Sequence, residues 1–583
     1  MEAPMHTINN PAQTTLFDPF SRVLTEKTRE QLLSGWQGIF REAILKLMPV
    51  QKLAKHFSAA MGRPSKELYS AAGLLVMKEF QNWTKEQAVE AYSFRMDIHY
   101  ALNLEPVAHD LSVRTLERYE NFFLEDDLAA EIMHLVTLAT VELCEVKVDQ
   151  QRLDSTHLFS DMATFGRTRM MGVTIKRFLT QVRRHDPEGY AALAEALRVR
   201  YEPGEHRLFG DTGKDEESRR NLRQQVAEDM HALLRRFEGD AKHNRRSTFL
   251  MLVKVFGQQC EVAEEKVVVR AKTGGNVIQN PSDADATYDG HKGPGYQVQL
   301  AETCNPENEV QLITSALPQT AVESDTAALP AVLEDLEKQD LLPKVLLSDA
   351  TYGSDENVQR AEAKGIEMVS PTKEGAQETG ASDPYATLTV DDFAIDEQRE
   401  TVACCPAGIA PESSVYDAAA GKTTTLMPAS ACGACEFRAE CPVREVKGTY
   451  RLEHTPRQRR LAGRRREERT DAFRERYRKR GGIEGTNSGL KRRTGLGRLR
   501  VRGMPRIRQA TLLRTTGWNI LRAAASAKAR AKVAALARKR LKTARFSHNR
   551  PGVRYHVPCI WLDPAALWRS TAPTTASSLR IAA

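Results

Sequence analysis

The chain has 583 residues, 41% of them hydrophobic, and a formal net charge of +8 at pH 7. This length is too great for one hydrophobic core, so the composition indicates a folded protein of several domains. The longest apolar runs fall short of the ~20 residues that span a bilayer, and the N-terminal segment lacks the basic start and apolar stretch of a secretory signal. We therefore expect no membrane segment and a cytoplasmic location.

Residues 1–140 predict a helical N-terminal domain. Apolar residues recur every three or four positions from about residue 24 to 60, which is typical of amphipathic helices. Ser112 precedes another apolar stripe and is a plausible N-cap. Two roles fit this domain equally well, namely a helix-turn-helix-like reader of DNA and a packing or dimerisation unit.

The pattern changes near Val146, where VKVDQQRLDST predicts a strand that ends on Asp154. A polar, helix-prone stretch follows and predicts a helical insertion over about 167–246. Strand patterns then return, succeeded by alternating helix and strand, and Asp349 follows the apolar strand at 345–347. Residues 141–372 are therefore expected to form most of a mixed α/β domain, in which strand ends commonly hold the active site.

Residues 373–450 are rich in Thr, Ala, Gly and Cys and predict a small separate insertion, which holds five of the nine cysteines. The knuckle Cys432-Gly-Ala-Cys435, with Cys405 upstream and Cys441 downstream, is typical of a tetrahedral thiolate site for structural Zn²⁺. Buried or redox-inert thiols are the alternative, and Cys404 can replace Cys405 in this pattern. Disulfides are not expected in the cytoplasm.

Basic residues gather between about 450 and 550. Residues 451–503 predict a core helix and a basic extension, and KRRTGLGRLRVRG within them has no acidic residue, which favours phosphate contacts over a solvated, charge-paired helix. The expected DNA-binding side chains here are Lys491, Arg492, Arg493, Arg498, Arg500 and Arg502. Residues 504–583 predict a basic helical C-terminal region and tail, which either binds DNA or packs on the core.

Asp154 and Asp349 are candidate ligands for divalent metal ions. Phosphodiester cleavage needs an activated water or hydroxyl and a stabilised leaving oxygen, and two Mg²⁺ ions about 3.5–4 Å apart on carboxylates supply both. Each Asp follows an apolar strand and precedes small or polar residues. A strand-end carboxylate without catalytic function is the alternative for each, and the nearby Asp161, Asp355 and Glu356 rank below them.

Glu484 is the third candidate ligand. It belongs to the pattern Y-x2-R-x3-E-x6-K with Tyr477, Arg480 and Lys491, whose offsets of three, four and seven form one stripe on a helix. Arg suits bidentate contact with a phosphate and Lys adds a point charge. Glycines at 481, 482 and 485 weaken the helix, so it is expected to bend or end near Lys491. A solvated charged helix is the alternative.

These motifs resemble the DDE transposases of bacterial insertion sequences, in the branch marked by this Tyr-Arg-Glu-Lys signature. DSTH and DATYGSDEN resemble the two Asp motifs, GLKRRTGLGRLRVRG resembles the basic extension, and GHKGPGYQVQLAETCNP resembles the strand between the Asp motifs. The resemblance covers about residues 62–503, although the helical segment after Asp154 departs from it in length. It implies an RNase H-like core in which Asp154, Asp349 and Glu484 bind Mg²⁺ or Mn²⁺.

By the same resemblance, the enzyme would cut the inverted-repeat ends of its element and join the freed 3′-hydroxyls to target DNA, with Tyr477, Arg480 and Lys491 holding phosphates. Double-stranded DNA is the expected partner, and a dimer on DNA is expected because two ends must be processed together. The expected location is bacterial, cytoplasmic and nucleoid-associated. Two rival functions are a catalytically inactive DNA-binding regulator derived from a transposase and an RNase H-like nuclease without strand transfer.

Overall fold

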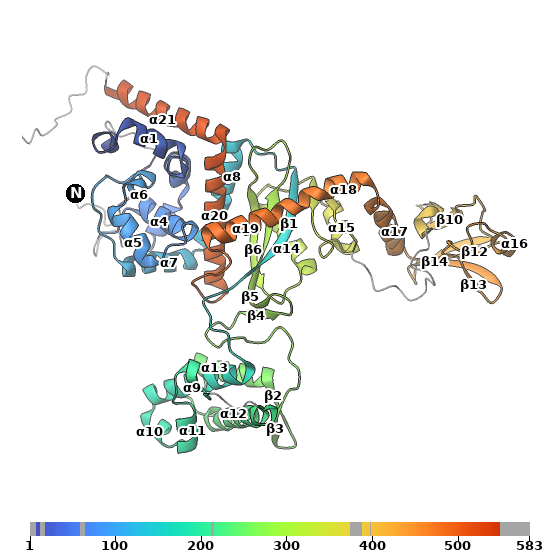
Figure 1. Cartoon of the computed structure of the whole chain (residues 1–583), viewed down its shortest axis with the longest axis horizontal. Helices are drawn as coiled ribbons and strands as arrows, with labels where there is room; N and C mark the ends of the chain where they lie inside the picture. The colour runs from blue at the N-terminus through green and yellow to red at the C-terminus, as the bar shows by residue number, and fades with distance from the viewer. Residues whose placement is uncertain are drawn as a thin grey trace, which may run out of the picture.

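The computed structural model describes residues 7–11, 18–58, 64–210, 215–372, 388–396 and 398–548, with side chains described as far as residue 540. Figure 1 shows a helical N-terminal part beside a central sheet, a helical module below the sheet, and a small strand-rich module at the far end of a helical connection. No helix in these ranges combines the length and apolar character that a bilayer span requires.

The N-terminal part is built mainly from α4 (Leu68–Phe80), α5 (Lys85–Phe94), α7 (Val113–Glu125) and α8 (Leu128–Cys144). Ser112 caps α7 as the sequence predicts, because its side chain accepts from the Thr115 backbone N–H. The shorter elements are η1 (Pro19–Arg22), α1 (Glu26–Ser34), α2 (Trp36–Ile39), η2 (Phe40–Ile44), η3 (Leu45–Leu47), α3 (Val50–Ala54) and α6 (Met96–Ala101).

The C-terminal helix α20 (Met504–Ala525) joins this helical part to the sheet, since it packs against α4, α8 and β6 (Ile313–Thr320). One hydrophobic core therefore runs from the N-terminal helices through the sheet to α20. A buried ion pair reinforces the joint, because Arg514 Nε lies 2.9 Å from Glu79 Oε2. The following helix, α21 (Ala527–His548), packs on α8 and α1.

The central sheet has the strand order β4-β5-β1-β7-β8, with β6 also paired to β5. β1 (Gln150–Leu158) runs antiparallel to β5 (Gly293–Thr303) and parallel to β7 (Val345–Leu347), which is parallel to β8 (Glu367–Val369). The short β4 (Thr287–Asp289) lies on the outer edge of β5. This mixed sheet with its covering helices confirms the predicted mixed α/β, RNase H-like fold class.

Helices cover both faces of the sheet. α14 (Asp325–Lys338) packs on the face that carries Leu153 and Ala301, and these residues share a hydrophobic cluster with it. α19 (Gly482–Thr494) and α20 lie on the other face, where Leu300 and Leu490 belong to the main core. Side chains alternate along a strand, so Asp154 shares the α19 face with its cross-strand partner Leu300.

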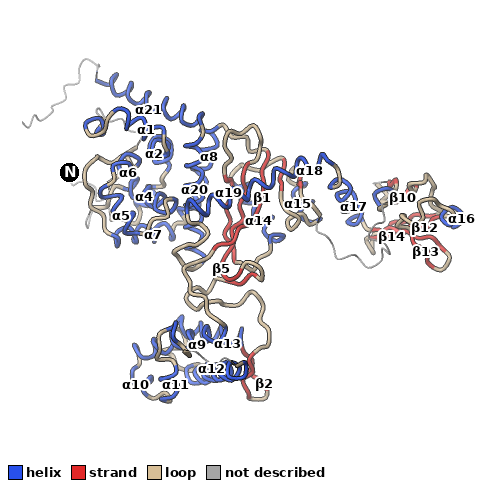
Figure 2. Tube along the Cα trace, in the orientation of Figure 1, coloured by secondary structure: helices blue, strands red, loops and turns tan. Residues whose placement is uncertain are grey.

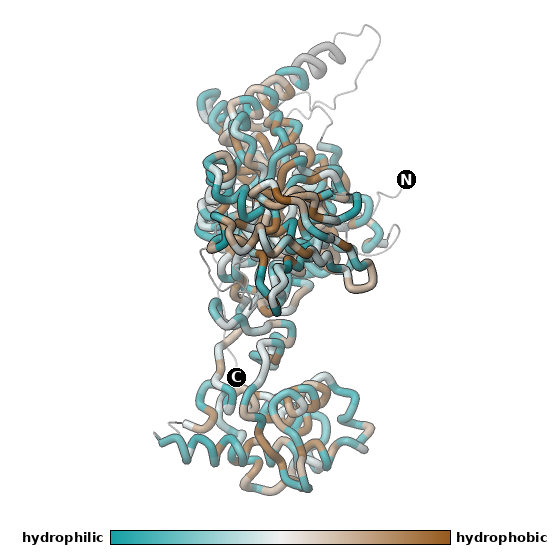
Figure 3. Tube along the Cα trace, turned by 90° about the vertical axis from the view of Figure 1, so that its right-hand side faces the viewer, coloured by the Kyte–Doolittle hydropathy of each residue, from teal (hydrophilic) through white to brown (hydrophobic). Residues whose placement is uncertain are grey.

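The helical module is inserted between β1 and β4 and has a hydrophobic core of its own. Its long helices are α9 (Arg167–His185), α12 (Glu216–Phe237) and α13 (Ser247–Gln259), and a hairpin of β2 (Cys260–Ala263) and β3 (Lys266–Val269) closes it. Figure 3 shows it as a lobe apart from the main body. Its short elements are α10 (Pro187–Ala191), α11 (Glu195–Arg200) and η4 (Glu205–Arg207).

The strand-rich module contains a four-stranded antiparallel sheet in the order β11-β12-β14-β13 and a small pair, β9 with β10 (Figure 2). Their bounds are β9 (Ala394–Asp396), β10 (Thr401–Cys404), β11 (Ser413–Asp417), β12 (Lys422–Met427), β13 (Arg444–Val446) and β14 (Thr449–His454). The short helical elements are η5 (Val390–Asp392) and α16 (Ala429–Gly433). The chain then leads back to α19 through α17 (Pro456–Glu468), α18 (Asp471–Tyr477) and the 3-10 turn η6 (Arg478–Gly481). In the central sheet domain, α15 (Asp355–Glu362) precedes β8.

Candidate active site

Asp154 lies in the middle of β1, because the strand continues to Leu158 instead of ending on the carboxylate as the sequence pattern predicted. The additional length comes from pairing with β5, whose register extends from Gln151–Thr303 to Leu158–Tyr296. Central placement makes the carboxylate rigid, and its side chain is only 14% exposed. A buried acid in this setting needs charged or hydrogen-bonding partners.

Asp349 follows β7 by two residues, at the end of the parallel strand next to β1. The Thr351 backbone N–H donates to its Oδ1 at 2.8 Å, and the Thr351 hydroxyl also donates to this carboxylate. The hydroxyl of Ser370 donates to the backbone carbonyl of Asp349 at 2.7 Å. This turn fixes the direction of the Asp349 side chain by local hydrogen bonds.

Glu484 lies in the first turn of α19 and is the most accessible of the three carboxylates, with 69% of its side chain exposed. Lys491 lies on the same helix as Glu484. Tyr477 and Arg480 do not, because Tyr477 ends α18 and Arg480 lies in the 3-10 turn η6. α19 ends at Thr494, where the next residue is a glycine with φ +69°. A 3-10 turn thus interrupts the helical path before Glu484, and α19 ends three residues after Lys491.

Arg480 joins the three carboxylates. Its Nη2 lies 3.0 Å from Asp154 Oδ1 and 3.9 Å from Asp349 Oδ2, while its Nη1 lies 3.0 Å from Glu484 Oε1. The three predicted acidic residues, separated by up to 330 positions in sequence, therefore surround one cationic group. A guanidinium in this position balances the charge of carboxylates that would otherwise repel one another.

The electrostatics of Asp154 reflect these neighbours. Burial raises the pKa of Asp154 above its ordinary value, the charge of Arg480 opposes this rise, and the charge of Asp349 adds to it. Burial by itself would lower the pKa of Arg480, but the carboxylates around it reverse the effect and raise that pKa. The site accordingly favours a bound cation and disfavours an additional negative charge.

The three carboxylates do not form a compact set of metal ligands in this structure. Among the residues that the structure describes, three potential ligand atoms lie within 4.8 Å of one another only at Asp186, Asp240 and His243. That group belongs to the helical module, where Asp186 caps α10 and His243 lies 3.5 Å from it. The carboxylates around Arg480 are more widely spaced, with the guanidinium between them.

A buried ion pair beneath the site was not predicted from the sequence. Arg152, two positions before Asp154 on the same face of β1, donates from Nε and Nη2 to Glu302 Oε2 at 2.8 and 2.6 Å. Its Nη1 donates to the carbonyl of Lys479 at 2.9 Å, and the Thr486 hydroxyl donates to Glu302 Oε1 at 2.7 Å. Burial raises the pKa of Glu302, with Arg152 opposing. This network fixes η6 and α19 on the sheet.

Two more polar residues at the site escaped the sequence analysis. Asn487 Nδ2 donates to Asp154 Oδ2 at 3.2 Å, and its Oδ1 is buried with no hydrogen-bond partner among the described residues. Asp325 accepts hydrogen bonds from Ser155 Oγ at 3.1 Å and Gln299 Nε2 at 2.9 Å. Asn487 follows Glu484 by three residues, so helical spacing alone is a signal that could have indicated it.

Tyr477 and Lys491 both lie near enough to this centre to feel its charges. The Tyr477 ring stacks on Phe473 with a centroid distance of 5.7 Å, and burial raises the pKa of its hydroxyl. Burial lowers the pKa of Lys491, and the charge of Lys292 lowers it further, while the charge of Asp154 opposes this decrease. Lys292, in the turn before β5, lies 3.5 Å from Ser155 Oγ. Two lysines therefore lie near the buried carboxylate.

The basic extension runs beside the end of β1. The Phe159 N–H donates to the Gly497 carbonyl at 3.0 Å, and the Leu499 N–H donates to the Phe159 carbonyl at 2.7 Å. Its predicted DNA-binding arginines are all exposed, namely Arg492, Arg493, Arg498, Arg500 and Arg502. Some already contact the protein, since Arg493 bonds to Gln81, Arg500 to the carbonyl of Asn82, and Arg502 to Asp161.

The lower-ranked acidic residues have other contacts. Asp161 pairs with Arg502 at 3.3 Å, and Asp355 accepts from Arg460 with both oxygens at 3.0 and 2.7 Å. Glu356 is exposed on α15. The predicted thiol ligands Cys405, Cys432, Cys435 and Cys441 line one pocket in the strand-rich module. Cys559, an isolated cysteine for which the sequence indicates no more than a small core residue, lies outside the described residues.

Comparisons with known proteins bear on this site. Residues 404–524 match the family described as "Transposase DDE domain", and this segment includes Arg480, Glu484 and Lys491, whereas both aspartates precede it. Among solved structures, the chain is similar to the piggyBac transposase synaptic complex with hairpin DNA, at 10% identity and a TM-score of 0.22, over 67% of this chain and 74% of that chain. Comparison with curated proteins finds no match. The domain match supports a DDE transposase.

Proposed function

We propose that this chain is a DNA transposase of the insertion-sequence type, which cleaves the inverted-repeat ends of its element and joins them to target DNA. The observation that carries the proposal is the meeting of Asp154, Asp349 and Glu484 at the Arg480 guanidinium. The match of residues 404–524 to a transposase DDE domain supports it from sequence.

The donor set fits Mg²⁺ or Mn²⁺, because both prefer carboxylate and other oxygen ligands. Asp154, Asp349 and Glu484 would hold the ions, and Asn487 Oδ1 is a buried oxygen without a partner among the described residues beside Asp154. When bound, two such ions activate the attacking water or hydroxyl and stabilise the charge on the leaving oxygen. The guanidinium of Arg480 lies among these carboxylates, so the site already accommodates a positive charge.

The chain's own residues then position the DNA. Once Arg480 is released from the carboxylates, its guanidinium can donate two hydrogen bonds to a phosphate. Lys491 and Lys292 supply further positive charge next to Asp154, and Tyr477 offers a hydroxyl from the end of α18. Arg492 and Arg498 extend this basic surface along the end of β1. Together these residues form a surface suited to double-stranded DNA.

The remaining assignments complete the proposal. Two element ends must be held together, so we assign a dimer on DNA, in the cytoplasm of a bacterium and associated with the nucleoid. The N-terminal helices over about 1–140 would bind DNA or dimerise, and the modules within 141–450 are insertions into the core. The basic segments at 451–503 and 504–583 would complete the site and its DNA contacts.

The test uses a labelled duplex that carries the DNA flanking the gene, purified protein and Mg²⁺, with the variants Asp154→Ala, Asp349→Ala and Glu484→Ala. Cleavage at the element boundary that is lost in all three variants, followed by joining of the 3′-hydroxyl to a target plasmid, is the expected result. Glu356→Ala, an exposed acid outside the site, is the matched control and should cleave normally. Equal cleavage in all variants would contradict the assignment of the carboxylates.

Two other outcomes of this experiment would favour a rival function over the proposed transposase. Cleavage without any joined product would indicate a nuclease that lacks strand transfer. Specific binding of the duplex without cleavage, in Mg²⁺ and in Mn²⁺ alike, would indicate a DNA-binding regulator.

A further inference from the structure

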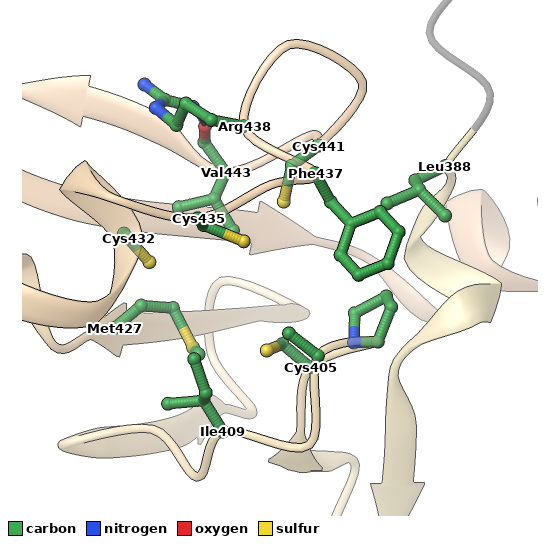
Figure 4. A pocket seen from close by; sticks show the side chains of 12 residues that line it. Leu388, Cys405, Ile409, Met427, Cys432, Cys435, Phe437, Arg438, Cys441 and Val443 are labelled. Atoms are coloured by element: carbon green, nitrogen blue, oxygen red, sulfur yellow. Dashed lines mark hydrogen bonds between the residues drawn. The ribbon is translucent and has the colours of Figure 1, made fainter.

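The strand-rich module contains a pocket lined by four cysteines (Figure 4). Cys405 follows β10, Cys432 lies in α16, Cys435 follows that helix, and Cys441 precedes β13. Figure 4 shows their sulfur atoms directed toward a common space from different sides. Residues up to 36 positions apart in sequence are thus brought to one point by the fold of the module.

Two tight turns present three of these thiols, namely Cys405, Cys432 and Cys435. The Cys405 N–H donates to the Ile409 carbonyl at 2.9 Å and the Gly408 N–H donates to the Cys405 carbonyl at 2.8 Å, with Gly408 at φ +76°. In the second turn, the Cys435 N–H lies 3.5 Å from the Cys432 carbonyl. Turns of this kind direct the thiols of a Cys-x-x-Cys knuckle toward one metal ion.

The surroundings of the thiols do not explain their convergence. All four are free cysteines, and Cys405 and Cys432 are only 9% and 8% exposed. The rest of the pocket is mainly apolar, with Met427, Ile409 and Phe437 among its lining residues. Burial raises the pKa of Cys432, and the neighbouring thiols raise it further. A single buried thiol commonly packs as a small hydrophobic group, whereas four thiols around one pocket also have the number and type of ligands that Zn²⁺ prefers.

We propose that Cys405, Cys432, Cys435 and Cys441 bind one structural Zn²⁺ ion. Zn–S bonds of about 2.3 Å in a tetrahedron place the sulfurs about 3.8 Å apart. Among the described residues, no three of these sulfurs lie within 4.8 Å of one another, so binding draws them inward. The thiols release their protons on binding, which leaves a net negative charge. Arg438 lines the pocket and its charge lowers the pKa of Cys432, so it compensates that charge.

The structure also distinguishes between the two adjacent cysteines. Cys404 lies in β10, pairs with Ala394 of β9, and does not line the pocket. Cys405 follows the strand and faces the other thiols. The sequence pattern left both open, and the geometry selects Cys405 as the ligand.

The proposed ion has a structural consequence for the path to Glu484. The core of the module is small and includes Ala462 of α17. Arg466 of α17 pairs with Asp391 at 3.2 Å and with Asp392 at 2.6 Å. α17 continues through α18 to the turn that carries Arg480. On this proposal, the ion stabilises the small core through which the module is held on α17.

The test measures the metal content of the full-length wild-type protein, purified under reducing conditions without chelator, by plasma mass spectrometry. About one zinc per chain is the expected result. A thiol-blocking mercurial reagent should release it, and a zinc-sensitive dye reports the release. No bound metal, iron in place of zinc, or a disulfide among the four cysteines would each overturn the proposal.

Matched variants identify the ligands. The zinc content per chain should fall at least about tenfold in Cys432→Ser and in Cys435→Ser, whereas Cys404→Ser should keep the zinc content of the wild type. If Cys404→Ser loses zinc and Cys405→Ser does not, the ligand assignment is wrong. Limited proteolysis within 388–454, compared with and without chelator, reports folding of the module independently of any DNA cleavage. Metal content does not depend on transposition, so failure of this proposal and failure of the proposed function are distinguishable.

Discussion

Arg480 is expected to compete with divalent metal for the three carboxylates, and Arg480→Gln tests this competition. Its bond to Asp154 is charge-assisted, 3.0 Å long and largely buried, and such bonds contribute about 1.5–3 kcal/mol. The bond to Glu484 adds little, because Glu484 is mostly exposed and its pair is screened by solvent. Removal of the guanidinium should therefore tighten metal binding about 10- to 100-fold.

The assay is isothermal titration calorimetry of Mn²⁺ into DNA-free protein at pH 8. The matched control is Arg478→Gln, because the Arg478 side chain is 78% exposed and pairs only with Glu475 among the described residues. DNA cleavage by Arg480→Gln should fall even though metal binds more tightly, since the proposed contact between Arg480 and a DNA phosphate is lost. Unchanged or weaker Mn²⁺ binding by Arg480→Gln would refute the competition.

The pH dependence supplies a second readout of the same site. Burial raises the pKa of Asp154 and Arg480 holds that rise in check. Metal binding needs the ionised carboxylate, so Mn²⁺ affinity should weaken as the pH falls through this raised pKa. Without Arg480 the pKa of Asp154 rises further, and the loss of affinity should begin at a higher pH than in the wild type. A pH profile that shifts the other way would contradict this electrostatic account.

Three further predictions concern the scaffold and the DNA surface. Glu302→Ala leaves Arg152 buried without its carboxylate, so urea unfolding should show a loss of about 3–5 kcal/mol. Gly482→Ala should reduce stability and cleavage, because the new methyl would lie 2.0 Å from Arg152 Nη1. Its matched control is Gly485→Ala, which has open space around the new methyl and should be neutral or stabilise α19 by up to about 1 kcal/mol. Arg498→Gln should lower DNA affinity for all sequences alike and reduce the slope of log affinity against log salt by about one.

The mixed α/β fold class was predictable because it depends on local patterns. Strand-like runs in series, followed by alternating helix and strand, already indicate a sheet covered by helices. The extent of β1 beyond Asp154 was not predictable, because it depends on pairing with β5 more than 130 residues away. The polar residues after Asp154 look like the end of a strand, and only the partner strand extends it.

The residues that hold the candidate site in place could not be predicted for the same reason, because their contacts join distant parts of the sequence. Arg152 and Glu302 are 150 residues apart and each looks like an ordinary charged residue in its own segment, yet both are buried and paired. The shared core of the N-terminal helices and α20 also depends on contacts between the two ends of the chain. Local spacing did indicate Arg480 and Glu484, which are in contact four residues apart. Their catalytic role stays a prediction.

The three carboxylates differ in how firmly the fold holds them, and this difference suggests the order in which they act. Asp154 is central in a buried strand, and Asp349 is fixed by the hydrogen bonds of Thr351. Glu484 is mostly exposed and its contact at the site is with Arg480, which itself must be displaced. Asp154 and Asp349 would therefore hold a metal ion before Glu484 does, and Glu484 would become available as Arg480 leaves. On this reasoning, Glu484→Gln should weaken Mn²⁺ binding less than Asp154→Asn does in the same calorimetric titration, and the opposite order would contradict it.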